Sequence, residues 1–191
     1  MKRLILASAS PRRRELLTNA GFEFEIVPSE IEEPGASGAP PGAFAERVAQ
    51  LKAETVARTF ASTYKAVVLG ADTIVVVGGA LLGKPRSPEE ARAMLEKLSG
   101  RAHEVITGVA LAEPGGRCAV AHETTLVQFR ELSSEEIEAY VASGEPLDKA
   151  GAYAIQGRAS RFVNRIEGCY LNVMGLPVAL VDRMLKDWKD N

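Results

Sequence analysis

Cysteine and histidine are scarce in this chain of 191 residues, which contains two of each. Cys118 and Cys169 lie far apart in the sequence, so the chain has neither a CxxC pair nor a multi-cysteine zinc site, and two cysteines are too few for a disulfide scaffold. A chain of this length buries enough surface to fold without cross-links. The low cysteine content is typical of a reducing compartment, and we therefore expect a cytoplasmic protein.

The chain also lacks a large excess of charge of either sign. Its 23 lysines and arginines are nearly balanced by 25 aspartates and glutamates, which gives a net charge of −2. No general positive field is available to hold a nucleic acid backbone, so we expect no nucleic acid partner. The longest apolar run, residues 66–83, is interrupted by Asp72 and several glycines, which favours strands and a turn over a membrane helix. The apolar stretch near the N-terminus is too short for a signal peptide.

Apolar runs alternate with helix-start signals along the chain. The apolar segment 4–7 predicts a buried strand, and Ser10 followed by Pro11 predicts a helix that ends before Gly21. By the same criteria, strands are expected at 22–27, 67–71, 73–77, 80–82, 104–112, 118–129, 153–155 and 162–166, and helices at 43–61, 88–98, 134–142 and from 178 to about 186. This order predicts an α/β fold with a mixed, twisted sheet flanked by helices, in a single domain over residues 1–191.

The segment Ser8–Arg14 joins the first expected strand to the first expected helix. Free backbone N–H groups and the positive end of the helix dipole favour an anion at such a junction. Arg12, Arg13 and Arg14 oppose that dipole unless an anion lies among them. The segment is therefore either an anion site or a solvated basic turn.

Asp72 stands within a valine-rich segment, where an ionised carboxylate must be paired, bind a metal or face a cleft. We predict a catalytic or metal-binding carboxylate, and the alternative is an aspartate bonded to backbone at a bulge. Lys52 lies in a helix of small and apolar residues, and Lys84 lies in a rigid turn before Pro85. Together with Arg13 and Asp72, these lysines have the character of a phosphate clamp around a metal-bound water.

Two further candidate sites lie in expected loops. Glu32 and Glu33, in the proline- and glycine-rich segment 28–42, either complete a metal site with Asp72 or form a solvated acidic pair. Gln156 offers a donor and an acceptor, as needed to bind the edge of a base. His103 is expected to cap a strand or pack at a sheet edge.

Six motifs in register resemble those of the Maf family of nucleoside triphosphate pyrophosphatases, and the resemblance extends from about Leu4 to Leu185. The motifs are Ser8–Arg13, Gly70–Thr73, Gly83–Pro85, Thr107–Val109, Asp148–Gly151 and Gly175–Pro177. The resemblance implies an α/β fold of the inosine triphosphate pyrophosphatase type, with a cleft between two lobes. It also implies hydrolysis of a small-molecule nucleoside triphosphate to the monophosphate and diphosphate, with Mg²⁺ or Mn²⁺ as cofactor.

The resemblance further implies roles for individual residues. The family aspartate that matches Asp72 is assigned as the general base. The residues around the triphosphate and the metal match Ser8, Arg13, Glu33, Lys52 and Lys84, with Glu33 and Asp72 as the expected metal ligands. Members that act on dTTP and UTP match this chain at Arg12, Thr73 and Gln156, so pyrimidine nucleotides are the expected substrates.

Two other functions stay open at this point. A sister group of the family acts on 7-methyl-GTP. Members have also been linked to arrest of septum formation and cell division, so a non-catalytic nucleotide-binding regulator is the second alternative. Family members often form dimers, which makes a homodimer one expected assembly.

Overall fold

The computed structural model describes residues 3–32, 34–35, 38–61 and 64–190, which form two compact units. Unit 1 comprises residues 1–73, 107–123 and 175–191, and unit 2 comprises residues 74–106 and 124–174. Within the described part of the chain, no helix is both long and apolar enough to cross a membrane.

One mixed sheet contains seven strands of the described residues, in the order β2-β1-β3-β5-β6-β7, with β4 paired to β3. The strands are β1 (Arg3–Leu6), β2 (Phe24–Ile26), β3 (Ala66–Val77), β4 (Ala80–Leu82), β5 (Ala102–Ala112), β6 (Cys118–Phe129) and β7 (Val163–Glu167). β1 runs parallel to both β2 and β3, with Leu4 opposite Phe24 and Val67, whereas β4 and β7 pair antiparallel with β3 and β6. The predicted mixed α/β sheet is confirmed.

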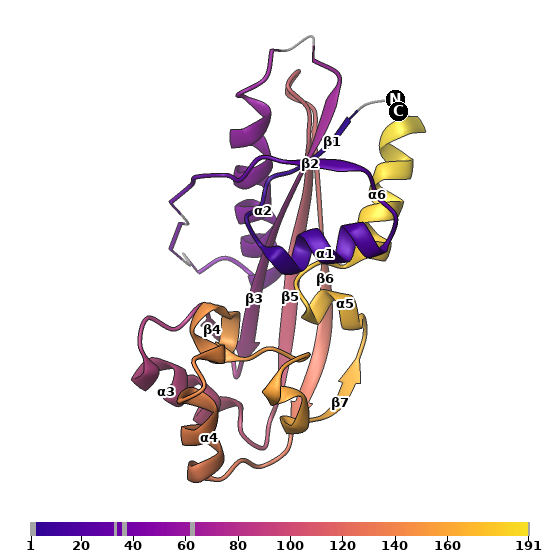
Figure 1. The fold of residues 1–191 in the computed structure, drawn as a ribbon. Helices are drawn as coiled ribbons and strands as arrows, with labels where there is room; N and C mark the ends of the chain where they lie inside the picture. The colour runs from indigo at the N-terminus through magenta and orange to yellow at the C-terminus, as the bar shows by residue number, and fades with distance from the viewer. Residues whose placement is uncertain (1–2, 33, 36–37, 62–63, 191) are drawn as a thin grey trace. The chain divides into compact units, whose positions relative to one another are not determined.

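Unit 1 carries the helices α1 (Pro11–Asn19), α2 (Pro41–Ala57) and α6 (Val178–Asp190), shown in Figure 1. Ser10 caps α1 as predicted, because its side chain accepts the backbone N–H of Arg13. The apolar face of α2 packs on the sheet in a fully buried cluster that includes Ile5, Ala49 and Val68. This packing fixes α2 against the strands that carry the candidate site.

Unit 2 carries α3 (Pro88–Leu98), α4 (Ser134–Val141), α5 (Tyr170–Val173) and three short 3-10 helices over Glu145–Asp148, Ala150–Ala152 and Arg158–Phe162. α4 begins with a capping box, in which Ser133 and Glu136 exchange side-chain and backbone hydrogen bonds. The core of unit 2 contains an aromatic cluster in which the rings of Tyr140 and Phe162 meet edge to face, with centroids 5.3 Å apart.

Two expectations about strands are wrong. Residues 67–71 and 73–77 form one continuous strand, β3, rather than two. Residues 153–155 are not a strand, because the chain turns just before them, where Gly151 and Ala152 both have positive φ values of 67° and 59°. The ring of Tyr153 then joins the aromatic cluster of unit 2 instead of a sheet edge.

Candidate active site

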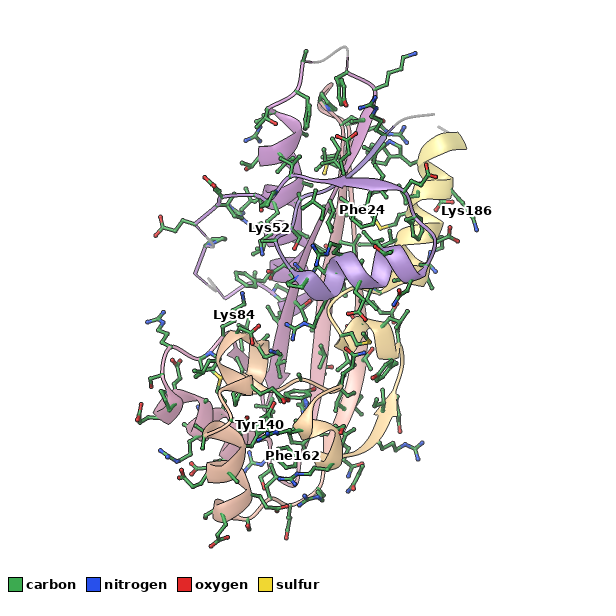
Figure 2. All side chains as sticks on the ribbon, viewed as in Figure 1. Phe24, Lys52, Lys84, Tyr140, Phe162 and Lys186 are labelled. Carbon is green, nitrogen blue, oxygen red and sulfur yellow. The ribbon has the colours of Figure 1, made fainter. Side chains whose placement is uncertain are left out.

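Asp72 and Lys52 form a buried ion pair in unit 1. Lys52 Nζ lies 2.7 Å from Asp72 Oδ1, and the two side chains are only 12% and 10% exposed. Asp72 comes from β3, and Lys52 comes from α2, where it is labelled in Figure 2. The carboxylate is therefore paired, as an ionised group at this depth must be, and its partner is a cation suited to contact phosphate.

Two glycines allow α2 to approach the sheet closely enough for this pair to form. A Cβ atom at Gly70 would lie 2.2 Å from the carbonyl oxygen of Ala49, and one at Gly108 would lie 2.2 Å from backbone atoms of Ala45. Any larger residue at either position would push the helix away from the strands. The sequence Gly70-Ala71-Asp72 thus combines the carboxylate with the space for the helix that supplies its partner.

Arg13 is the centre of a second polar group in unit 1. Its Nη1 donates to Ser8 Oγ at 3.2 Å, its Nη2 donates to Thr73 Oγ1 at 3.1 Å, and its Nε donates to the carbonyl oxygen of Gly175 at 2.9 Å. Three separate segments of the chain thereby hold one guanidinium group in a fixed orientation. Arginine presents its donors in a rigid plane, which suits it to bind phosphate once it is oriented.

The two polar groups start from neighbouring residues of β3. Side chains alternate between the faces of a strand, so Asp72 and Thr73 point to opposite faces. Asp72 meets α2 on one face, and Thr73 meets Arg13 of α1 on the other. The predicted residues Ser8, Arg13, Lys52, Asp72 and Thr73 therefore form two separate groups in unit 1, one on each face of β3.

The other predicted site residues lie outside these two groups. Arg12 is half-buried in the first turn of α1, beside Arg13 in the sequence. Glu33 lies outside the described residues. Lys84 and Gln156 are exposed residues of unit 2, after β4 and in a turn respectively.

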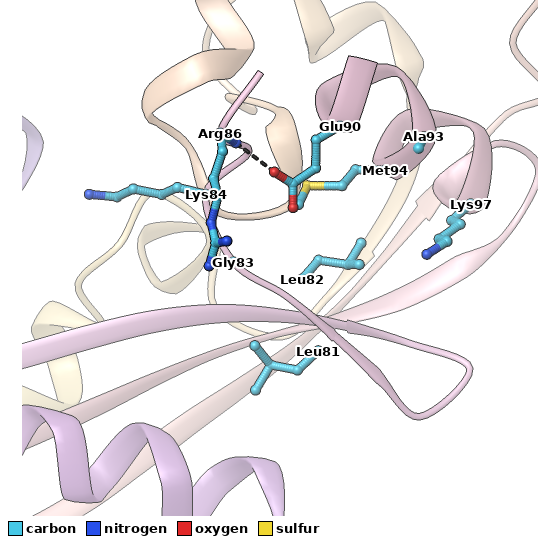
Figure 3. Close-up of a pocket in the computed structure, with 9 residues that line it drawn as sticks. All are labelled: Leu81, Leu82, Gly83, Lys84, Arg86, Glu90, Ala93, Met94 and Lys97. Carbon is cyan, nitrogen blue, oxygen red and sulfur yellow. Dashed lines mark hydrogen bonds between the residues drawn. The ribbon is translucent and has the colours of Figure 1, made fainter. Parts of the chain in front are cut away.

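A pocket of about 300 Å³ lies between β4 and α3 in unit 2, and Lys84 contributes to its rim (Figure 3). In that view the ammonium end of Lys84 points away from Glu90 and Met94. Glu90 accepts the backbone N–H of Arg86 at 2.7 Å, which ties the residue before the Ser87 cap to the first turn of α3. The lining residues are Leu81, Leu82, Gly83, Lys84, Arg86, Glu90, Ala93, Met94 and Lys97.

The donor set in unit 1 fits a divalent cation only in part. No three His, Cys, Asp or Glu side chains gather as a metal cluster anywhere in the described part of the chain. Mg²⁺ is usually held by one or two carboxylates together with substrate phosphates and water. Asp72, a hard oxygen ligand, fits a cation of this kind that a bound triphosphate would also ligate.

Two residues of this region were part of the family motifs without an assigned role. Thr107 is completely buried in β5, and its Oγ1 lies 2.9 Å from Thr73 Oγ1. Gly175 supplies the carbonyl oxygen that accepts from Arg13. The only signal in the sequence was a polar residue in an apolar strand and a glycine before Leu176-Pro177, and neither indicates a partner.

Comparison with solved structures defines the fold class. The chain aligns with the Ham1 protein of Staphylococcus aureus with a TM-score of 0.56, covering 97% of this chain and 99% of the other at 16% identity. A HAM1 protein of Coxiella burnetii gives a TM-score of 0.57, covering 98% and 100% of the two chains, also at 16% identity. At this identity the likeness concerns the fold alone, and it agrees with the predicted fold class.

Comparison with protein families is more specific. The family described as "Maf-like protein" matches residues 3–188, and this chain belongs to that family. It is 54% identical to the dTTP/UTP pyrophosphatase of Moorella thermoacetica, covering 97% of this chain and 94% of the relative. It is 47% identical to the dTTP/UTP pyrophosphatase of Pelotomaculum thermopropionicum, covering 100% and 99%. The predicted family is confirmed.

Proposed function

We propose that this chain is a nucleoside triphosphate pyrophosphatase that hydrolyses dTTP and UTP to the nucleoside monophosphate and diphosphate. The buried pair of Asp72 and Lys52 is the observation that carries the proposal, because it places a carboxylate of the family motif in β3 beside a cation from α2. Relatives named dTTP/UTP pyrophosphatase are 54% and 47% identical over nearly the whole chain.

Asp72 is the proposed general base. Its carboxylate orients a water molecule and takes one proton from it while the water oxygen attacks the α-phosphorus. The bond from the α-phosphorus to the bridging oxygen breaks, and diphosphate leaves. Lys52 compensates the charge of the carboxylate before the reaction and can shift toward a phosphate oxygen as negative charge develops there.

The remaining proposed contacts are those of the nucleotide with Ser8 and Arg13 of unit 1 and with Lys84 and Gln156 of unit 2. In unit 1, Ser8 and Arg13 bind phosphate oxygens at the N-terminus of α1, where the helix dipole also favours an anion. For Lys84 and Gln156 of unit 2 we propose the phosphate contact and the base contact that the family resemblance implies. A divalent cation held by Asp72 would neutralise charge on the phosphates when bound.

Substitution of Asp72 by asparagine tests the proposed base. A carboxamide cannot accept the proton, so we expect the rate of diphosphate release from dTTP to fall by at least about 100-fold in Asp72→Asn. The measurement is release of diphosphate with Mg²⁺ or Mn²⁺, repeated with a chelator to test the cation. Asp182→Asn is the matched control, because Asp182 is a half-buried aspartate paired with Lys186 on α6. A folded Asp72→Asn protein with full turnover would contradict the assignment.

A panel of nucleotides separates this function from its alternatives. Turnover of dTTP and UTP supports the proposed substrates, whereas turnover of 7-methyl-GTP alone keeps the reaction and overturns the base preference. Nucleotide binding without turnover by the folded protein would favour a regulator instead. Gln156→Ala should change the ratio of dTTP to 7-methyl-GTP turnover more than the rate on the better substrate.

A further inference from the structure

Thr107 lies beneath the group that holds Arg13. It is a β5 residue with no exposed surface, and its Oγ1 lies 2.9 Å from Thr73 Oγ1. Thr73 Oγ1 in turn accepts a hydrogen bond from Arg13 Nη2 at 3.1 Å. A chain of hydrogen bonds therefore leads from a buried strand residue to the guanidinium group, and all of its members belong to unit 1.

Gly175 closes the same network from another segment. Its carbonyl oxygen accepts from Arg13 Nε at 2.9 Å and lies 3.4 Å from Thr73 Oγ1. The residue has a φ of +114°, a conformation that side-chain-bearing residues rarely adopt, and this conformation accompanies the inward-facing carbonyl. Thr73 is thus held between a hydroxyl group and a carbonyl group.

The hydrogen atoms of the two hydroxyl groups limit what Thr73 can do. A hydroxyl group has one hydrogen and two lone pairs, and the arginine can only donate. If Thr107 donates to Thr73, then Thr73 donates to Gly175 and keeps a lone pair for Arg13. If Thr73 donates to Thr107, both of its lone pairs face other donors, and Arg13 is the donor present. In both cases Thr107 fixes the rotation of the Thr73 hydroxyl so that it accepts from Arg13.

We propose that Thr107 is a positioning residue for phosphate binding, acting on Arg13 through Thr73. This inference rests on the proposed function, in which Arg13 contacts the phosphates of the nucleotide. Without the Thr107 hydroxyl, Thr73 loses one of the two groups that orient its own hydroxyl. The guanidinium group keeps its bonds to Ser8 and Gly175 but is held less firmly through Nη2 before the substrate arrives. An arginine that must be ordered on binding contributes less to affinity.

Thr107→Val tests the proposal, because valine keeps the shape of the side chain and removes only the hydroxyl group. We expect the KM for dTTP to rise about tenfold, with kcat within about threefold of the wild type. Thr107→Ser restores the hydroxyl group and should restore KM to within about twofold. Thr125→Val is the matched control, since Thr125 is equally buried and its hydroxyl bonds the backbone of Cys169 in unit 2. It should lower stability without raising KM, and all variants are compared where circular dichroism shows them folded.

A second readout does not depend on catalysis. The Nε–H of Arg13, bonded to the Gly175 carbonyl, should exchange with solvent slowly, and its NMR signal is assigned by its loss in Arg13→Lys. We expect exchange to accelerate at least about fivefold in Thr107→Val and to stay unchanged in Thr107→Ser. An unchanged exchange rate in Thr107→Val overturns the positioning role, as does an equal rise of KM in Thr107→Ser. If the wild type hydrolyses no nucleotide, the proposed function fails, and the exchange measurement still decides the role of Thr107.

Discussion

His103 shows how far the interior of unit 2 differs from water. Its side chain is almost fully buried, its Nε2 lies 2.9 Å from the hydroxyl of Tyr153, and its ring meets Phe129 edge to face. Burial lowers the pKa of His103 from 6.5 to about 4 and raises the pKa of Tyr153. His103 is the second residue of β5, which lies between β3 and β6, so the expectation that it packs at a sheet edge is wrong. This histidine is a neutral core residue at physiological pH.

The low pKa of His103 predicts a loss of stability in mild acid. The unfolded chain binds the proton near pH 6.5, whereas the folded chain binds it only near pH 4. Stability is therefore complete above about pH 6.5 and falls as the pH drops toward 4. Between pH 7 and 5 we expect a loss of about 2 kcal/mol in the free energy of unfolding, measured by urea titration.

Two variants isolate the contribution of His103. His103→Gln cannot titrate, so its stability should change less between pH 7 and 5, although it starts from a lower value. His122→Gln removes the other histidine of the sequence and keeps His103, so it should retain the loss. Equal pH dependence in His103→Gln and the wild type would contradict the assignment.

The ion pair between Lys52 and Asp72 depends on how closely α2 packs against the sheet. Small residues, Ala45 and Ala49, face the glycines of β3 and β5 and let the helix backbone approach the strands. Lys52 lies about one turn further along the same helix, so its reach to Asp72 depends on this close approach. Packing between elements thus positions a chemical group that neither element could position alone.

Gly108→Ala tests this dependence. The new Cβ would lie 2.2 Å from backbone atoms of Ala45, which cannot move aside as a flexible side chain could. We expect a loss of about 1–3 kcal/mol in the free energy of unfolding, together with reduced diphosphate release. Gly115→Ala is the matched control, since nothing lies within 4 Å of its Cβ position and it should be close to neutral. Equal stability of the two variants would show that α2 adjusts without strain.

Local signals were sufficient for some elements and not for others. The start of the helix at residue 134 and the strand over residues 118–129 were both predicted, and they match α4 and β6, because helix-start and strand signals depend on neighbouring residues only. Residues 153–155 are an apolar segment that was expected to form a strand, but the preceding turn and the aromatic core determine their conformation. Tertiary packing here outweighs local propensity.

In the candidate site, too, some residues could be predicted from their own segment and others could not. Asp72 could be predicted because a carboxylate in an apolar strand needs an explanation from its own segment. The role of Thr107 could not, since threonine is an ordinary strand residue and its bond to Thr73 depends on the register between β5 and β3. The residue type of Asp72 was enough to predict a charged group with a chemical role. Its partner Lys52 depends on how α2 packs on the sheet, and the partner of Thr107 depends on the strand register.

At the scale of the whole molecule, the small net charge makes local placement of cations decisive. With 23 cationic and 25 anionic residues, the chain attracts no polyanion in general, so any anion must bind where cations converge. In unit 1, the group around Arg13 and the pair of Lys52 with Asp72 each hold one cation in a defined position, and in the proposed function these two cations contact the phosphates. A nucleotide should therefore stabilise the folded chain, and a nucleic acid should not.

Thermal unfolding measures this difference without turnover. A ligand at 100 times its Kd stabilises the folded state by about 2.7 kcal/mol, which corresponds to a rise in Tm of roughly 5–10 °C for a chain of this size. The probe is a UTP analogue with an imido bridge between the α- and β-phosphorus atoms, added with Mg²⁺. Duplex DNA at the same phosphate concentration is the control and should leave Tm unchanged, because DNA binding needs a positive surface of a size that the composition does not supply.

Arg13→Gln should reduce the shift in Tm caused by the analogue, since it removes the guanidinium that Ser8, Thr73 and Gly175 hold in place. A full shift in Arg13→Gln would exclude this guanidinium from phosphate binding, and an equal shift with DNA would contradict recognition of a single nucleotide.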